Sequence, residues 1–437
     1  RKQYLYFPEI KGLLSAKLKA ITTMKLKTFL IVGCLGGFFA LNSCTAPTNE
    51  KDYSVFVNPF IGTGGHGHTF PGAVVPHGMI QPSPDTRIDG WDACSGYYYE
   101  DSTINGFSHT HVSGTGCCDY GDVLLMPTVG EQRYQTTDPQ SQQLAYSSAF
   151  SHENETAEPG YYSVFLDTYQ VKAEISATKR GAIHRYTFPE SSEAGFILDL
   201  DYSLQRQTNS DMGIEVISDT EICGHKKTTY WAFDQYINFY AKFSKPFSYT
   251  LVTDSITMDN GKRLPVCKVL LHFNTTKDEQ VLVKVGISAV DIAGARKNVE
   301  SEIPGWDFDK VRKNARSAWN QYLSKIDITT PDKDDKTIFY TALYHTAISP
   351  NLFTDADGRY LGMDLEVHQG DTINPLYTVF SLWDTFRALH PLMTIIDPDL
   401  NNQFINSLIK KHQEGGICPM WDLGANYTGT MIGYHAV

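Results

Sequence analysis

The hydrophobic periodicity of this chain changes near residue 304, and this change constrains the fold more than any other feature. Between residues 53 and 303, apolar residues alternate with smaller or polar ones, as in the run at 281–287. A period of two residues is typical of strands that bury one face. From residue 308 onward the apolar residues recur at helical spacing, as in the segment 308–326. The chain therefore combines a region of strands with a region of helices.

We predict a multidomain β + α protein on this basis. An antiparallel β-sandwich is expected at 53–303, and a helical domain is expected at 306–437. The helical part has room for about five helices of ordinary length. It ends at Val437 in an apolar segment without a cap or a polar tail. We interpret this ending as a bundle or barrel of helices that is cut within an element.

Residues 1–44 have the pattern of an export signal. Met24 is followed by two lysines and by an uncharged apolar run from Thr28 to Leu41. This run is too short to span a membrane but has the layout of a secretory signal peptide. It ends in Leu-Asn-Ser-Cys, which resembles a bacterial lipobox, so Cys44 is expected to carry a lipid. An ordinary signal peptide that contains a cysteine is the alternative.

Composition excludes some classes of function and permits others. The chain has 37 Lys and Arg against 49 Asp and Glu, a net charge of −12, which argues against a nucleic-acid-binding protein. Its 25 Tyr and 23 Phe suit the binding of sugar rings, and they suit an aromatic β core equally well. The six cysteines after Cys44 match no zinc pattern and indicate no particular disulfide.

The segment Asn58–Asp85 is dense in Gly, Pro and His, which indicates a loop shaped around a ligand or a tight glycine-rich connection. It contains the pair His66 and His68, and a second His-x-His pair follows at His109 and His111. On a strand, alternate residues share a face, so each pair has the spacing of a transition-metal site. No clustered carboxylate is evident, and we therefore assign these histidines structural or substrate-contacting roles and no metal.

Two stretches combine tryptophan with charged residues. Trp91 begins the run WDACSGYYYED, and an indole beside carboxylates suits a sugar, although Trp91 fits an ordinary core equally well. In SLWDTFRALHPL, Asp384 and Arg387 are spaced i, i+3 and can pair on a helix. Apolar neighbours predict that this pair is partly buried and available to sugar hydroxyls, with a surface ion pair as the alternative. Trp421 is expected on a loop, where its ring would form a platform.

Glycoside cleavage requires two carboxylates on opposite sides of a pocket. No pair in this sequence has a recognisable signature of that kind. Asp355, Asp384 and Asp422 are candidates by position only.

Several long motifs in the same order resemble glycoside hydrolase family 92. They are VNPFIGTGGHGHTFPGAVVPHGMIQPSPD, GFSHTHVSGTG, GDVLLMP, FSHENETAEPGYYSV, SLWDTFRALHPL and the terminal MIGYHA. The resemblance extends from Tyr53 to Val437. It implies a β-sandwich followed by an (α/α)6 barrel with the active site between them. It also implies an exported, calcium-dependent exo-α-mannosidase, as found in Bacteroidetes, that releases terminal α-linked mannose from glycans with inversion.

On matching motif positions, the resemblance implies that Asp384 and Arg387 bind mannose hydroxyls and that Trp91 and Trp421 line the same pocket. The family's catalytic Glu and Asp, and most of its calcium ligands, follow the stretch that ends at Val437. We therefore expect an incomplete barrel, assign no catalytic or metal residue, and expect this chain to be inactive alone. The implied location is the periplasm, the outer membrane or the cell surface, with membrane attachment through the lipid only.

Two other functions remain open. One is a different enzyme built from a sandwich and a barrel, such as a disaccharide phosphorylase, although no phosphate-binding cluster is recognisable. The other is a surface glycan-binding lipoprotein without catalysis, which a helical half would not require. The mannosidic linkage that is cleaved cannot be read from these motifs.

Overall fold

The computed structural model describes residues 51–135, 140–253, 255–257, 263–371 and 373–436. The predicted signal and the predicted lipidation site, Cys44, lie outside the described residues. In the part of the chain that is described, every helix is too short or too polar to cross a bilayer.

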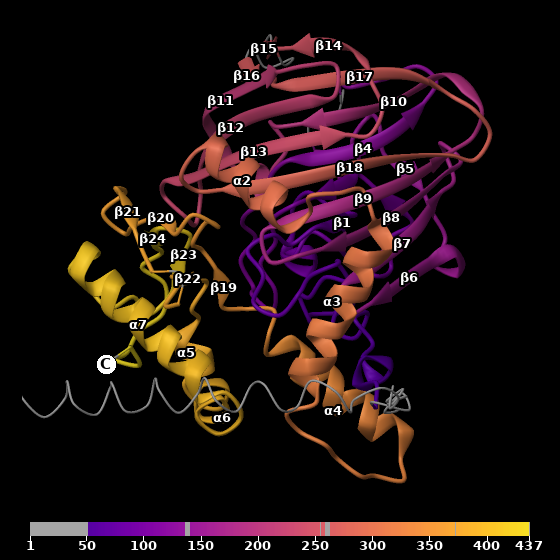
Figure 1. Cartoon of the computed structure of the whole chain (residues 1–437). Coiled ribbons are helices and arrows are strands. Elements are labelled where there is room, and N and C mark those ends of the chain that lie inside the picture. The colour runs from indigo at the N-terminus through magenta and orange to yellow at the C-terminus, as the bar shows by residue number, and fades with distance from the viewer. Residues whose placement is uncertain (1–50, 136–139, 254, 258–262, 372, 437) are drawn as a thin grey trace, which may run out of the picture. The chain divides into compact units, whose positions relative to one another are not determined.

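Two antiparallel sheets dominate residues 83–288 (Figure 1). The larger sheet has eight strands, in the order β11 (Thr208–Val216), β12 (Glu221–Thr229), β13 (Gln235–Phe243), β18 (Glu279–Ser288), β9 (Gly181–Phe188), β8 (Val171–Ala177), β7 (Tyr161–Leu166) and β6 (Glu155–Glu158). The smaller sheet has six strands, in the order β1 (Ser83–Asp85), β3 (Gly106–Ser108), β4 (Leu124–Val129), β10 (Ser191–Asp199), β17 (Lys268–Thr275) and β14 (Ser248–Val252). The predicted antiparallel, β-rich first half is confirmed.

The central strands of the eight-stranded sheet are largely buried on both faces. Successive residues of a strand point to opposite sides of a sheet. Tyr162 accordingly belongs to the core between the two sheets, which also contains Phe196. Its neighbour Tyr161 belongs to a separate cluster on the opposite face, with Val299 and Phe308 from the helical region. This explains why the strands carry more apolar residues than a simple alternation requires.

The remaining elements are short pairs of strands and the helices. The pairs are β2 (Thr103–Ile104) with β5 (Ser148–Ala149), β15 (Ser255–Thr257) with β16 (Arg263–Pro265), β19 (Asn351–Leu352) with β22 (Tyr377–Thr378), β20 (Arg359–Leu361) with β21 (Val367–Gln369), and β23 (Asp422–Leu423) with β24 (Asn426–Tyr427). The α-helices are α2 (Ile292–Glu302), α3 (Phe308–Leu323), α4 (Lys333–His345), α5 (Leu382–Thr385), α6 (Leu389–Ile396) and α7 (Pro398–Gly415). Short 3-10 helices are η1 (Tyr53–Phe56), η2 (Trp91–Ala93), η3 (His152–Asn154) and η4 (Leu204–Arg206).

Helix α2 lies directly on the eight-stranded sheet (Figure 1). Gly286 of β18 allows this close approach, because a Cβ at that position would lie 2.2 Å from the carbonyl oxygen of Ala295. A buried polar cluster lies beside this contact, between the end of β18 and α2. Oδ2 of Asp355 accepts a hydrogen bond from Ser288 at 2.6 Å, and Oδ1 accepts one from Asn298 at 2.7 Å. Strands and helices therefore share a packed boundary.

The glycine-rich segment at 58–82 packs against the helical region. Its residues Phe70 and Val74 belong to the same apolar cluster as Trp319 of α3. The indole Nε1 of Trp319 donates a hydrogen bond to the carbonyl of Val74 at 2.6 Å. Nδ1 of His77 forms a hydrogen bond with the carbonyl of Pro350 at 2.9 Å. Much of this segment is thus a structural connection.

The predicted helical periods correspond to α3, α4 and α7, but one expected helix is divided. Apolar residues from Leu382 to Met393 follow a helical period, yet the structure has α5 and α6 separated by a turn at 386–388. Helix α6 begins at Leu389, and His390 and Pro391 occupy its next two positions. Proline is compatible with the first turn of a helix but not with its interior, which favours a new start here.

Candidate functional site

The connection between β3 and β4, residues 109–123, organises the candidate site. Two of its residues, Val112 and Tyr120, are buried in a cluster that also contains Trp421. A third, Gly116, lies under the indole of Trp91. This connection therefore contacts two of the residues that the sequence analysis assigned to substrate binding.

Trp91 begins the 3-10 helix η2 and is 59% exposed, so it is a surface residue and not a core residue. Its ring rests on Gly116, where a Cβ would approach the indole to 2.3 Å. The imidazole of His68 meets it edge to face, with ring centroids 4.7 Å apart. The thiol of Cys94 donates to the carbonyl of Trp91 at 3.0 Å. These contacts hold an exposed indole in a fixed orientation.

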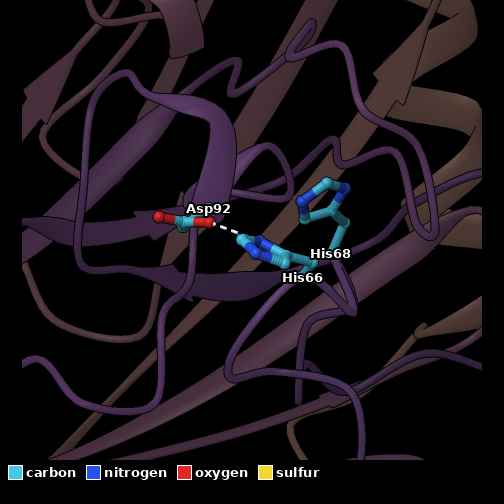
Figure 2. Close-up of side chains that lie close together, drawn as sticks. All are labelled: His66, His68 and Asp92. Atoms are coloured by element: carbon cyan, nitrogen blue, oxygen red, sulfur yellow. Dashed lines mark hydrogen bonds and ion pairs between the residues drawn. The ribbon is translucent and has the colours of Figure 1, made fainter.

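Asp92, the next residue of η2, lies beside the first His-x-His pair (Figure 2). Its Oδ1 is 2.7 Å from Nδ1 of His66, and both side chains are partly exposed to solvent. His68 is buried, and burial lowers the pKa of its imidazole. His68 adopts a left-handed backbone with φ of 55°, so the two histidines are not on a strand as the spacing argument assumed.

The second pair has a structural role, as the sequence interpretation allowed. Nδ1 of His109 lies 2.6 Å from the carbonyl of Val123, and its Nε2 lies 3.1 Å from Nε2 of His184. Nδ1 of His184 in turn lies 2.9 Å from the hydroxyl of Tyr186. One choice of tautomers satisfies all three hydrogen bonds. In it, Tyr186 donates to His184, His184 donates to His109, and His109 donates to the backbone carbonyl. Burial lowers the pKa of His109 to about 4, which keeps it neutral.

The other member of that pair, His111, is also fully enclosed by protein partners. Its Nε2 lies 2.9 Å from Oδ1 of Asp85, and neither side chain is exposed. Its Nδ1 lies 2.7 Å from the carbonyl of Gln81. Both ring nitrogens are thus engaged, and no nitrogen remains for a metal ion.

The structure contradicts the predicted buried pair of Asp384 and Arg387. Both side chains are exposed, and no ion pair joins them among the described residues. The reason is that α5 ends at Thr385, so Arg387 lies in the following turn and the helical i, i+3 geometry does not apply. Asp384 accepts a hydrogen bond from the hydroxyl of Ser381. The guanidinium of Arg387 lies over the ring of Trp383, 4.6 Å from its centroid.

Trp421 is not an open platform. It is only 3% exposed, and its ring packs against that of Trp231 with centroids 4.3 Å apart. Ser381 forms an isolated antiparallel bridge with Trp421, which places the start of α5 beside it. Trp231 is half-buried and donates from Nε1 to the hydroxyl of Thr430 at 2.7 Å. The indole nearer to solvent in this pair is therefore Trp231.

The two buried carboxylates that were candidates by position have structural partners. Asp422 forms an ion pair with Lys411 at 2.9 Å, and neither side chain is exposed. Asp355 belongs to the polar cluster at the junction described above, and burial raises its pKa to about 6. A cavity of about 470 Å³ lies between the strand and helix regions and is lined in part by His77, Tyr322 and Asp397. None of the predicted substrate-binding residues lines it.

Sequence reasoning missed the turn between β12 and β13, which contributes aromatic side chains near Trp421. Tyr230 is 42% exposed and Phe233 is 58% exposed. Asp119 fixes this turn, because its Oδ2 accepts from the backbone nitrogen of Ala232 at 2.9 Å. Burial raises the pKa of Asp119 to about 6. The signal was the aromatic run Tyr230-Trp231-Ala232-Phe233 between two alternating segments, which is unusual for a hairpin turn.

Two family models match almost all of the described chain. The model described as the glycosyl hydrolase family 92 N-terminal domain matches residues 56–288. The model described as the glycosyl hydrolase family 92 catalytic domain matches residues 294–437. The chain belongs to glycoside hydrolase family 92. The two models divide the chain where β18 ends and α2 begins.

Solved structures of family 92 members are similar to this chain. The α-mannosidase BT3965 from Bacteroides thetaiotaomicron is 36% identical, with a TM-score of 0.83 over 88% of this chain and 53% of that chain. The inverting mannosidase BT2199 from the same organism is 27% identical, with a TM-score of 0.76 over 88% of this chain and 51% of that chain. An uncharacterized secreted glycosidase of Arthroderma benhamiae is 29% identical over 76% of this chain and 47% of its own length. The chain thus spans about half the length of these relatives.

Proposed function

We propose that this chain is the first part of an exported exo-α-mannosidase that releases terminal mannose from α-linked glycans by a single, inverting displacement. The observation that carries the proposal is the likeness to a family 92 α-mannosidase over 88% of this chain at 36% identity. A second structure of that relative contains mannoimidazole. Because the chain covers about half of such relatives, hydrolysis is proposed for the longer protein, and this chain alone is proposed to be inactive.

The exposed aromatic side chains around residues 109–123 support a sugar as the ligand. Trp91 rests on Gly116 of this connection, and the exposed Tyr230 and Phe233 belong to the turn that Asp119 of the same connection holds. Flat apolar rings beside carboxylates suit the apolar face and the hydroxyls of a hexose. We propose that Trp91 contacts the glycan and that Asp384 and Arg387, being exposed, are available to its hydroxyls.

The metal-ligating side chains that the described residues bring together do not fit a calcium ion. Among the described residues, the one group of three or more His, Cys, Asp and Glu side chains with suitable spacing is His66, His68 and Asp92. Calcium prefers six to eight oxygen ligands, and two imidazoles do not suit it. We therefore propose that the calcium ligands, like the catalytic acid and base, belong to the part of the longer protein that this chain does not cover.

Export and lipid anchoring are also part of the proposal. The Arthroderma relative bears the name of a secreted glycosidase. Residues 24–44 have the layout of a signal peptide that ends in a lipobox-like sequence. We propose that Cys44 becomes the lipidated first residue of the mature protein, which is then held at a membrane surface by its lipid.

The test is mannose release by the full-length protein, measured on α-mannobioses of each linkage with and without a calcium chelator. We expect hydrolysis that stops on chelation, and proton NMR that detects β-mannose first, as inversion requires. Independence from phosphate separates hydrolysis from phosphorolysis. Glycan binding without any release would favour the non-catalytic alternative.

Two variants connect the activity to this part of the chain. Trp91→Ala should raise KM for the mannobiose at least about tenfold, because an exposed stacking ring is lost. Tyr249→Ala, which removes a ring of similar exposure on β14, is the matched control and should change nothing. Equal kinetics for both variants would contradict the role of Trp91, and mannose release by the 437-residue chain alone would contradict its proposed incompleteness.

A further inference from the structure

Three side chains with metal-ligating atoms meet where the glycine-rich segment approaches η2 (Figure 2). One ligand atom from each of His66, His68 and Asp92 lies within 4.8 Å of the others. In a tetrahedral zinc site, with metal–ligand bonds of 2.0–2.2 Å, neighbouring ligand atoms are roughly 3.3 Å apart. Small side-chain rotations of the two exposed ligands, His66 and Asp92, would bring the group to that spacing.

His68 supplies a second, independent observation. It is only 6% exposed, and its Nε2 has no hydrogen-bond partner among the described residues. Buried polar atoms in native proteins are nearly always paired, so an unpaired one points to an absent partner. Figure 2 shows a nitrogen of this ring on the side that faces His66 and Asp92. A cation between the three residues would provide the missing partner.

We propose that His66, His68 and Asp92 form a binding site for a divalent transition-metal ion, with zinc as the occupant. The two imidazoles and one carboxylate are the donor set that zinc accepts and that calcium and magnesium do not favour. The ion would take the place of the hydrogen bond between Nδ1 of His66 and Oδ1 of Asp92, which lie 2.7 Å apart, and a proton on Nδ1 would move to Nε2 of His66 or, from an imidazolium, to solvent. Three protein ligands leave the fourth position open to water, because His66 is on the surface.

Trp91 is a positioning residue for this site. Its indole meets the ring of His68 edge to face at 4.7 Å, and Gly116 packs against the same indole. The ring of His68 is thereby held with its free nitrogen toward Asp92. The metal site does not rest on the proposed mannosidase function, since it needs only these described residues.

The test is a zinc titration of the full chain by isothermal titration calorimetry after removal of metal with a chelator. Because the half-exposed thiols of Cys117 and Cys418 also bind zinc, the titrations use a Cys117→Ser/Cys418→Ser background. We expect one zinc ion per chain. His66→Ala and Asp92→Asn should each weaken binding more than about tenfold. His272→Ala, an exposed histidine on β17, is the matched control and should bind as the parent does.

A fluorescence measurement places the ion at this site independently of affinity. Cu²⁺ bound beside His68 should quench the emission of Trp91, and Trp91→Phe should lose that quenched component while it still binds zinc. Circular dichroism checks that each variant is folded. The proposal is overturned if the chain binds no zinc, if His66→Ala and Asp92→Asn bind it as tightly as the parent, or if calcium displaces zinc at equal concentration.

Discussion

Nζ of Lys411 on α7 lies 2.9 Å from Oδ2 of Asp422, and neither side chain is exposed to solvent. Asp422 also accepts hydrogen bonds from the hydroxyl of Thr378 at 2.7 Å and from the backbone nitrogen of Phe380 at 3.0 Å. This ion pair connects the last long helix to the strand pair β23–β24, immediately after Trp421. It therefore fixes the segment that follows Trp421 to α7.

Lys411→Met should destabilise the protein, because it leaves the carboxylate of Asp422 buried without its cation. Breaking a buried pair on one side costs about 3 to 5 kcal/mol of unfolding free energy. Urea denaturation of the parent and the variant measures this loss. Lys411→Met combined with Asp422→Asn removes both charges and should recover a large part of it. An unfolding free energy of Lys411→Met within about 1 kcal/mol of the parent value would contradict the buried ion pair.

Substitution of Trp421 should destabilise the fold much more than substitution of Trp91. Trp421 is 3% exposed, so Trp421→Ala should lower the unfolding free energy by about 3 to 5 kcal/mol. Trp91 is 59% exposed, so Trp91→Ala should cost less than about 1 kcal/mol. Thermal unfolding of the two variants under identical conditions measures the difference. Equal losses would mean that the two indoles are not in different environments.

The buried chain of hydrogen bonds through Tyr186, His184 and His109 predicts that the protein becomes less stable as the pH falls. Burial lowers the pKa of His109 from 6.5 to about 4, so between these values the unfolded chain binds the proton and the folded chain does not. Stability is therefore lost as pH falls from 6.5 towards 4, by up to roughly 3 kcal/mol for this residue. Burial raises the pKa of Asp119 and of Asp355 to about 6, and these two carboxyls act in the opposite direction.

A comparison of variants isolates the contribution of His109. His109→Asn keeps a donor for the carbonyl of Val123 and removes the titration. It should be less stable than the parent at pH 7.5, and this gap should narrow as the pH falls to 4.5, as urea denaturation at each pH would measure. The gap for His272→Asn, an exposed position, should stay constant. A constant gap for His109→Asn would contradict the predicted titration.

Gly286→Ala tests the packing of α2 on the sheet. The added Cβ would lie 2.2 Å from the carbonyl oxygen of Ala295, so the helix has to move away from β18. Overpacking of this kind costs about 1 to 3 kcal/mol. Gly305→Ala, with no atom within 4 Å of the added Cβ, is the control. Chemical denaturation should show a loss for the first variant and none for the second.

Cys44→Ser tests the lipid anchor. The parent protein, produced in a bacterial host that processes lipoproteins, should incorporate labelled palmitate and fractionate with membranes. The variant should incorporate no label and should appear in the soluble fraction. Labelling of the variant to the level of the parent would show that Cys44 is not the lipidation site.

The fold was predictable because its two regions follow different hydrophobic periods. The alternation at 281–287 corresponds to β18, and the helical spacing at 308–326 corresponds to α3. The break between α5 and α6 could not be predicted from periodicity. The turn between them has only three residues, so the apolar residues on either side of it keep nearly the same helical spacing. The second apolar face of the eight-stranded sheet also depends on α2, which is distant from most of those strands in sequence.

The candidate site was predicted less well, because its residues meet only in three dimensions. The exposure of Trp91 was one of two open interpretations, and the structure decides between them. The burial of Trp421 depends on Trp231, which lies 190 residues earlier, and the aromatic run around Trp231 does not indicate which ring it packs against. The carboxylate that completes the group at His66 and His68 is Asp92, whose sequence neighbours Trp91 and Tyr97–Tyr99 favour a sugar-binding motif instead. Spacing alone therefore underestimated the metal-ligating potential of this pair.

The polar cluster of Ser288, Asn298 and Asp355 has a consequence for how the protein can be handled. Ser288 ends β18, Asn298 is on α2, and Asp355 follows 57 residues after Asn298, yet two short hydrogen bonds away from solvent connect the three side chains. These hydrogen bonds fix the segment 289–291 between β18 and α2, so we do not expect it to act as a hinge. The two family models meet at this junction. If the two parts were nevertheless produced separately, each would expose to water the buried surface that now packs against the other, and each should aggregate.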